Sequence, residues 1–245
     1  MRALFVAAAA AVFLSAHASG VVVNLGASKD NTLFEDPAGS LSSGAGQWLF
    51  AGYTAQSSKR RGLLGFDVTS IPAGSTINSV RLTLHMSRTI TATELVTLHE
   101  VTSSWGEGTS DSNAMGGGIG APATAGDATW LHRFFDTSTW TTPGGDFNAG
   151  ALATTPVSGI GFYSWNTAAM AAQVQSWVNT PSTNNGWMLL GTETDPGSVK
   201  RFDSRENFTE ANRPVLVIDY TPIPGIASVA HLGAIGLAVA WRRRR

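Results

Sequence analysis

Four tryptophans in polar, glycine-rich parts of the chain are the residues whose chemistry stands out first. They are Trp105, Trp130, Trp140 and Trp165. An exposed aromatic ring can stack on a sugar, because a pyranose presents a patch of C–H groups to the face of the ring. The alternative is burial, in which the rings hold long loops onto the rest of the domain. We expect burial for any single ring, and a sugar contact from one or more of the set.

Polar side chains lie close to these rings in the sequence. Four of them could hydrogen-bond sugar hydroxyls or pair with uronate carboxylates, namely Arg133, Asp136, Asp146 and Asn148. The candidate ligand-binding residues are therefore Trp105, Trp130, Arg133, Asp136 and Trp140. By contrast, Trp48 and Trp187 fall in apolar runs and Trp177 falls on a predicted helix, so these three are expected in the core.

Catalytic chemistry finds little support in the sequence. The chain has no cysteine, no His-Glu-x-x-His motif and no Gly-x-Ser-x-Gly motif. Its body has three histidines without a paired partner in the sequence: His85, His99 and His132. Glycoside cleavage needs two carboxylates in defined roles, and the spacing of the available glutamates singles out no such pair. These glutamates are Glu94, Glu100, Glu107, Glu193, Glu206 and Glu210. We predict that the protein is not an enzyme, with a polysaccharide hydrolase or lyase as an alternative.

No cofactor is predicted, although structural calcium stays open. Loop aspartates often hold Ca²⁺ in β-rich domains, but the chain has no Asp-x-Asp-x-Asp-Gly loop. The candidate aspartates are Asp67, Asp127, Asp136, Asp146 and Asp203. The formal net charge is −1, yet five of the 16 bases, Arg2 and Arg242 to Arg245, lie at the two ends. The body is therefore acidic and lacks the basic surface that nucleic-acid binding requires.

The elements that position these residues are predicted to be short β-strands. Val80 to Met86 alternates apolar and polar side chains, which is typical of a strand with one buried face. Further extended runs lie between clusters of Gly, Pro, Asn and Ser, at 95–101, 129–134, 159–163, 187–190 and 215–220. Many short strands separated by turns predict an all-β fold, an antiparallel β-sandwich of the jelly-roll kind.

One short helix and one long loop interrupt this pattern. Residues 168–178 carry side chains at helical spacing, Asn166 or Thr167 can cap the helix, and Pro181 ends it. Residues 103–127 are polar and rich in glycine, with Gly116-Gly117-Gly118 at the centre. We expect this segment to be a long loop that carries function.

Both ends of the chain have the composition of transport signals. Residues 1–18 combine a positive start, an apolar run and an Ala-x-Ala site, which predicts a signal peptide cleaved after Ala18. At the other end, a proline-containing stretch from residue 222 precedes an apolar run over 223–241 and four arginines. As a helix, this run is just long enough to cross a bilayer core, and the arginines would stay on the cytoplasmic side.

The C-terminal tail, residues 222–245, resembles the PEP-CTERM class of bacterial sorting signals. It departs from that class in carrying Ile223-Pro224-Gly225 where Pro-Glu-Pro is usual. The resemblance implies membrane contact through residues 223–241 and processing by an exosortase-like enzyme. It also implies that the protein is secreted to the cell envelope or the extracellular surface.

Six segments of the body, residues 19–221, follow one another in a recognisable order. They are Asp30-Asn31-Thr32-Leu33-Phe34-Glu35, residues 61–67, residues 71–84, Trp105-Gly106-Glu107-Gly108, Ala128-Thr129-Trp130, and residues 202–206 with 213–216. In this order they resemble the DNRLRE domain, which is classed with the alginate-type carbohydrate-binding modules. Thr32 and Phe34 replace arginines of the name-giving motif, and Ser164-Trp165-Asn166 also departs from the family pattern.

This resemblance implies a β-sandwich from bacterial and archaeal surface proteins, some of which bind polysaccharide, and it does not imply catalysis. We therefore predict a secreted protein of the cell surface or extracellular matrix that acts as a non-catalytic module for polysaccharide or exopolysaccharide. The alternative is a structural envelope protein without a small ligand. Proteins that share a fold can differ in function, so the properties of the site itself must distinguish these two alternatives.

Overall fold

The computed structural model describes residues 19–223, except the side chains of Ala114 and Met115. The predicted signal peptide and residues 224–245 of the predicted sorting tail lie outside the described residues. Within the described range, no helix combines the length and the apolar character needed to span a membrane.

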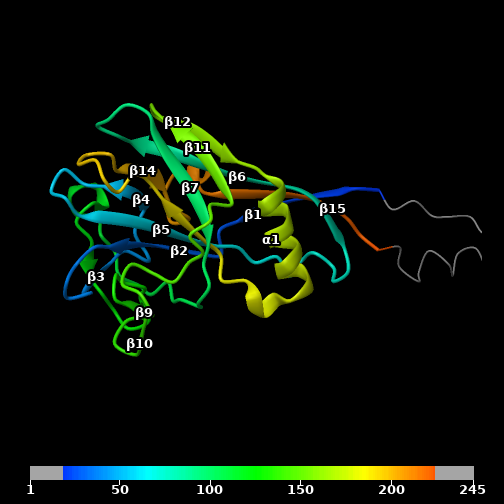
Figure 1. Ribbon diagram of the computed structural model, residues 1–245, viewed down its shortest axis with the longest axis horizontal. Coiled ribbons are helices and arrows are strands. Elements are labelled where there is room, and N and C mark those ends of the chain that lie inside the picture. Colours follow the sequence, from blue (N-terminus) through cyan, green and yellow to red (C-terminus); the bar gives the residue numbers. More distant parts are fainter. Residues whose placement is uncertain (1–18, 224–245) are drawn as a thin grey trace, which may run out of the picture.

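The described residues form fifteen β-strands, one α-helix and three short 3₁₀ helices (Figure 1). The strands are β1 (Val21–Gly26), β2 (Lys29–Phe34), β3 (Leu41–Ser42), β4 (Trp48–Tyr53), β5 (Lys59–Gly65), β6 (Thr76–Arg88), β7 (Glu94–Glu100), β8 (Ala121–Pro122), β9 (His132–Phe134), β10 (Ser138–Thr139), β11 (Ala153–Val157), β12 (Gly161–Trp165), β13 (Trp187–Leu190), β14 (Lys200–Asp203) and β15 (Val215–Thr221). The helices are η1 (Ala114–Gly117), α1 (Ala168–Asn179), η2 (Pro181–Thr183) and η3 (Glu210–Asn212).

Eleven of these strands join into one antiparallel sheet that curls around the core (Figure 1). The order along the sheet is β1-β15-β6-β14-β4-β5-β13-β7-β11, with β12 beside β6 and β2 beside β5. Strand β4 joins the two halves, because residues 48–51 pair with β14 whereas Gly52 and Tyr53 pair with β5. The first and last strands are neighbours, with Val21 opposite Tyr220.

The alternation predicted from Val80 to Met86 is confirmed in β6. Every second side chain of this stretch is buried in the core, while Arg81 between them is exposed. Strand β15 lies beside β6 with Leu216 opposite Leu82, so that two strands bring leucines to the same point of the core. Burying one such side chain contributes about 1.5–3 kcal/mol.

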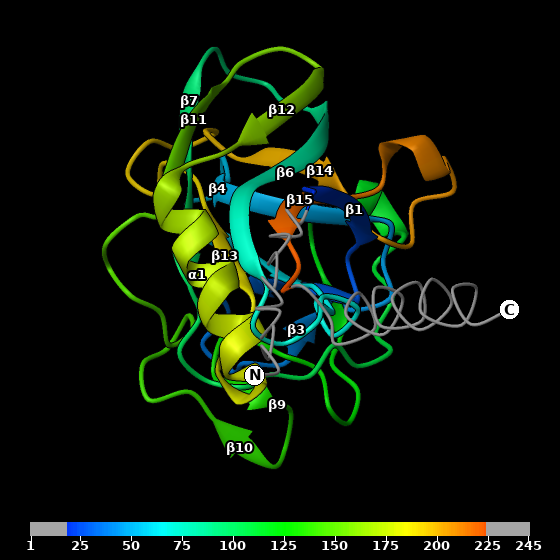
Figure 2. The ribbon, with the colours of Figure 1, turned by 90° about the vertical axis from the view of Figure 1, so that its right-hand side faces the viewer.

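The predicted helix is also confirmed. Helix α1 begins after Thr167, whose hydroxyl oxygen accepts a hydrogen bond from the Met170 N–H, and it ends before Pro181. It packs against β6 along one side of the curled sheet (Figure 2). Its buried residue Trp177 lies 4.8 Å from the ring of Trp187, which places both in the core as expected.

The fold class is therefore confirmed at the level of a mostly antiparallel β-protein with one short helix. The loop predicted over residues 103–127 contains only η1 and the two-residue strand β8. The narrower expectation, two packed layers of a β-sandwich or jelly roll, stays a prediction.

Candidate functional site

The three tryptophans of the predicted ligand site lie in the interior. The exposed fractions of Trp105, Trp130 and Trp140 are 2%, 7% and 5%, and the three rings pack together in a second apolar cluster beside the main core. The indole N–H of Trp105 donates to the Asn185 carbonyl at 2.8 Å, and that of Trp140 donates to the Thr129 carbonyl at 2.9 Å. In this arrangement the rings hold loops onto the sheet, which is the burial expected for any single ring.

The two polar members of the predicted site lie at the surface instead. Arg133 donates from Nη1 to the hydroxyl of Ser104 at 3.1 Å and lies over the ring of Phe134. Asp136 is exposed in the turn between β9 and β10, with a positive φ of 61°. The structure thus brings the three rings together, but not as an open surface shared with Arg133 and Asp136.

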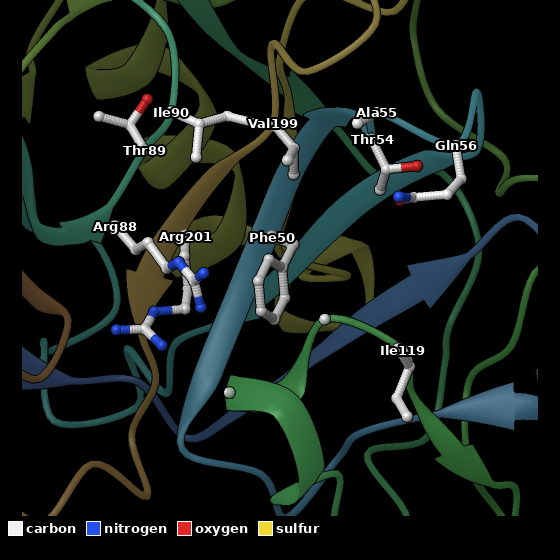
Figure 3. Close-up of a pocket in the computed structure, with 12 residues that line it drawn as sticks. Phe50, Thr54, Ala55, Gln56, Arg88, Thr89, Ile90, Ile119, Val199 and Arg201 are labelled. Atoms are coloured by element: carbon white, nitrogen blue, oxygen red, sulfur yellow. The ribbon is translucent and has the colours of Figure 1, made fainter.

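A groove on the outer face of the sheet gathers a different set of residues (Figure 3). We call it the arginine groove, and its volume is about 260 Å³. It is lined by Phe50, Thr54, Ala55, Gln56, Arg88, Thr89, Ile90, Gly116, Gly118, Ile119, Val199 and Arg201. Its floor is a row of side chains on three adjacent strands, because Arg201 of β14 lies opposite Phe50 of β4 on one side and opposite Arg88 of β6 on the other.

A register shift explains why both arginines face this groove. Phe202 of β14 is paired with Met86 of β6, and both side chains are fully buried. If the antiparallel pairing continued without a shift, the next residue, Arg201, would lie opposite Ser87 and not opposite Arg88. The pairing of β14 with β6 shifts by one residue between Phe202 and Arg201, and Arg88 takes that place. A β-bulge of this kind re-aims a side chain, and such bulges are common next to functional sites.

The glycine triplet of the long loop closes one side of the groove. Gly117 has a φ of +83°, and a Cβ atom there would stand 2.9 Å from the ring of Trp48. A Cβ atom at Gly116 would stand 3.0 Å from Nη1 of Arg201 and 3.5 Å from Nη1 of Arg88. The loop can therefore approach the aromatic and cationic floor this closely because it has no side chains at these points.

Neither arginine of the groove has an acidic partner within the part of the chain that the structure describes. Among the described residues, neither Arg88 nor Arg201 lies within 4.0 Å of a carboxylate. Arg201 donates from Nε to the hydroxyl of Ser87 at 3.1 Å and lies 4.5 Å over the ring of Trp48. Burial, opposed by attraction from Asp203 and reinforced by repulsion from Arg88, lowers the pKa of Arg201. The groove therefore presents two neighbouring positive charges to an incoming group.

The arginine groove was not predicted from the sequence. Counting every second residue from Val80 to Met86 leads next to Arg88, a position that the alternating pattern assigns to the core. A charged residue at that position was the one sign in the sequence that the strand is irregular there. Trp48, expected in the core from its apolar neighbours, is half-buried on the outer face beneath Arg201.

The aspartates considered for calcium are dispersed. Asp127 accepts hydrogen bonds from Thr124, Asp203 contacts His85 at 2.6 Å, and Asp67 and Asp146 accept hydrogen bonds within their own turns. Among the described residues, a different carboxylate trio comes within reach of a single ion: Asp30, Glu107 and Glu206.

Comparison with known proteins adds no family to these observations. No protein-family model matches the chain, and no curated protein matches it.

Proposed function

We propose that this protein is a non-catalytic module of the cell surface or extracellular matrix that binds an acidic polysaccharide in the arginine groove. The observation that carries this proposal is the pair Arg88 and Arg201, which lie opposite each other on adjacent strands without a carboxylate partner among the described residues. Like charges directly opposite each other destabilise a sheet unless an anion comes between them. A uronate carboxylate is an anion that two guanidinium groups can bind through charge-assisted hydrogen bonds.

The walls of the groove favour a sugar over a bare anion. Ile90 and Ile119 are 68% and 49% exposed, and together with Phe50 they give the groove apolar surface beside the two charges. A sugar ring has both kinds of surface, with C–H groups on its face and polar groups at its edge. The volume lies just below the ~300–1,000 Å³ usual for pockets that enclose whole ligands, which suits one unit of a longer chain.

The lining also favours binding over cleavage. The residues that line the groove include no Asp, Glu or His. Glycoside hydrolysis generally uses a pair of carboxylates, one as an acid and the other as a base or nucleophile. The proposed protein therefore holds its polysaccharide without cutting it.

The remaining parts of the proposal come from the sequence. We propose that the curled sheet is a DNRLRE-like sandwich, that residues 1–18 direct secretion, and that residues 222–245 are a PEP-CTERM-like tail handled by an exosortase-like enzyme. The alternative of a structural envelope protein without a small ligand is kept as an outcome of the experiment below.

Calorimetric titration with a soluble polyuronate, and with neutral dextran for comparison, tests the proposal. We expect binding to the polyuronate, and Arg88→Ala should weaken it by about tenfold or more, because a hydrogen bond to a charged group contributes about 1.5–3 kcal/mol. Arg81→Ala is the matched control, since Arg81 is an exposed arginine of the same strand outside the groove.

Three results would count against the proposal. Equal weakening by Arg81→Ala and Arg88→Ala would show that the protein responds only to its overall charge. Absence of binding to acidic and neutral polysaccharides alike would favour the structural envelope protein. Release of reducing ends or of unsaturated sugars would instead point to an enzyme.

A further inference from the structure

Three carboxylates from distant parts of the chain meet at the edge of β2. Asp30 lies in β2, Glu107 lies in the long loop after β7, and Glu206 follows β14. One oxygen atom from each of them lies within 4.8 Å of the other two. This carboxylate trio shares no residue with the arginine groove.

The chain holds Glu107 in place from several sides. The amide nitrogen of Asn31 donates to the Glu107 carbonyl at 2.8 Å, and the backbone N–H of Asp30 donates to Glu107 Oε1 at 2.8 Å. Gly44 packs so closely that a Cβ atom there would stand 1.7 Å from the same carbonyl oxygen. The position of Glu107 beside Asp30 is thus fixed by the fold.

Two oxygens of the trio are buried without a hydrogen-bond partner within residues 19–223. Asp30 is fully buried, and its Oδ2 accepts the backbone N–H of Arg205 at 2.7 Å, but its Oδ1 has no partner among the described residues. Oε2 of Glu206 is buried and without a partner in the same way. Leaving a charged oxygen buried and unpaired is costly, so folded proteins nearly always supply a donor or a cation.

The neighbouring bases do not balance the charge of the trio. Arg205 contacts both Glu107, at 2.8 Å, and Glu206, at 3.1 Å. Lys29, the other base close by, donates to the Trp105 carbonyl at 2.6 Å. Three acids thus face two bases. Burial, followed by repulsion from Glu206, raises the pKa of Asp30 well above its usual range.

We propose that the carboxylate trio binds a divalent cation, with one carboxylate oxygen each from Asp30, Glu107 and Glu206 as protein ligands. Oxygen donors alone suit the hard cations, and Ca²⁺ suits them best because it accepts irregular sites at about 2.3–2.6 Å. Oxygens on opposite sides of such an ion are up to about 5 Å apart, so three oxygens within 4.8 Å can share it.

The bound ion would add a direct link between three segments that hydrogen bonds, the Arg205 ion pairs and the contact of Lys29 with the ring of Trp105 already hold together. It would fix the long loop through Glu107 and the turn after β14 through Glu206 onto β2. This inference is independent of polysaccharide binding, because either site could be absent without affecting the argument for the other.

Calcium binding to the purified protein, after treatment with a chelator and dialysis, tests the inference. We expect calorimetry to show one Ca²⁺ site per chain with a Kd of about 10⁻⁴ M, in the range of extracellular calcium modules. At a calcium concentration of about 100 times Kd, the melting temperature should rise by about 5 °C or more. Mg²⁺ should bind more weakly.

Glu206→Gln is the informative variant, because it keeps the shape of the side chain and removes one charge. We expect it to bind Ca²⁺ at least tenfold more weakly and to show no rise in melting temperature with calcium. Without calcium, it should be at least as stable as the parent, since it relieves repulsion in the trio. The matched control Glu210→Gln changes a glutamate whose side chain is 84% exposed, and it should behave like the parent.

Two outcomes would overturn the inference. If Ca²⁺, Mg²⁺ and Mn²⁺ all fail to produce a binding heat or a melting shift in the parent protein, then protons balance the trio instead. If Glu206→Gln binds Ca²⁺ as the parent does, the ion lies elsewhere. The polyuronate titration stays informative in both cases, because its variants lie in the arginine groove.

Discussion

Arg61 and Glu193 form an ion pair through two parallel hydrogen bonds. The Nε atom of Arg61 donates to Oε1 of Glu193 at 2.7 Å, and its Nη2 donates to Oε2 at 2.8 Å. Both side chains are mostly buried, and the same guanidinium lies 4.9 Å over the ring of Trp130. The pair therefore ties a loop tryptophan to the sheet, whereas Arg88 and Arg201 have no such acidic partner among the described residues.

Glu193→Gln should lower the free energy of unfolding by about 1–3 kcal/mol, because it leaves Arg61 partly buried without a charged partner. Urea unfolding measures this loss. Glu210→Gln removes a surface pair at 3.9 Å and should change stability by less than about 0.5 kcal/mol. Equal losses of unfolding free energy in the two variants would show that the Arg61–Glu193 pair stabilises the protein no more than a surface ion pair does.

Leu82→Asp should prevent folding or lower the melting temperature severely, since Leu82 is fully buried and a charge there would have no partner. Thr83→Asp should be tolerated, because Thr83 lies on the other face of β6, where its hydroxyl is 3.0 Å from that of Ser164. Circular dichroism melting curves compare the two. Similar melting temperatures would contradict the register of β6.

Trp140→Phe should lower stability by about 1–3 kcal/mol, because the buried Thr129 carbonyl loses its donor. It should leave polyuronate binding unchanged, since Trp140 lies outside the arginine groove. Trp48→Phe alters the ring beneath Arg201. It should therefore weaken polyuronate binding more than it lowers the free energy of unfolding. A loss of affinity in Trp140→Phe alone would return the ligand site to the loop tryptophans.

Asp146 should stabilise the protein at neutral pH and lose this effect in acid. Burial acts to raise its pKa, but hydrogen bonds from the N–H groups of Thr141 and Thr142 and the hydroxyl of Ser103 outweigh it, so the pKa is lowered. A lowered folded pKa favours the carboxylate form. Its contribution is therefore complete above the unfolded pKa of about 3.9 and disappears as the pH falls through the folded value.

The measurement for Asp146 is the difference in unfolding free energy between the parent and Asp146→Asn at a series of pH values. This difference should shrink as the pH falls from 7 to about 3. A difference that stays constant over the whole series would mean that the carboxylate charge has no part in the turn.

The regular elements were predictable because their patterns are local. The alternation along β6 and the cap and spacing of α1 each depend on a few neighbouring residues, and both predictions are confirmed. Which tryptophans are buried and which lie on the outer face was harder to predict from the sequence. Trp105 has polar neighbours in the sequence but lies inside, because its loop folds back over the sheet, whereas Trp48 has apolar neighbours but lies on the outer face.

The candidate sites depend on pairings that local patterns do not contain. The meeting of Arg88 with Arg201 follows from a register shift between strands more than a hundred residues apart. Asp30, Glu107 and Glu206 stand in three of the segments that carry the family resemblance, but the sequence does not show that these segments converge. Only the fold places their carboxylates within reach of one another.

The pairing of β1 with β15 sets the order of events when this chain is made. Strand β15 lies between β1 and β6, so the sheet lacks an internal strand until residue 221 has been synthesised. Contacts between the two ends of a domain close slowly, because a long loop must be ordered first. The sheet can therefore be completed only after residue 221 has been synthesised, because the last strand to be made is the one that joins the first strand to the rest of the sheet.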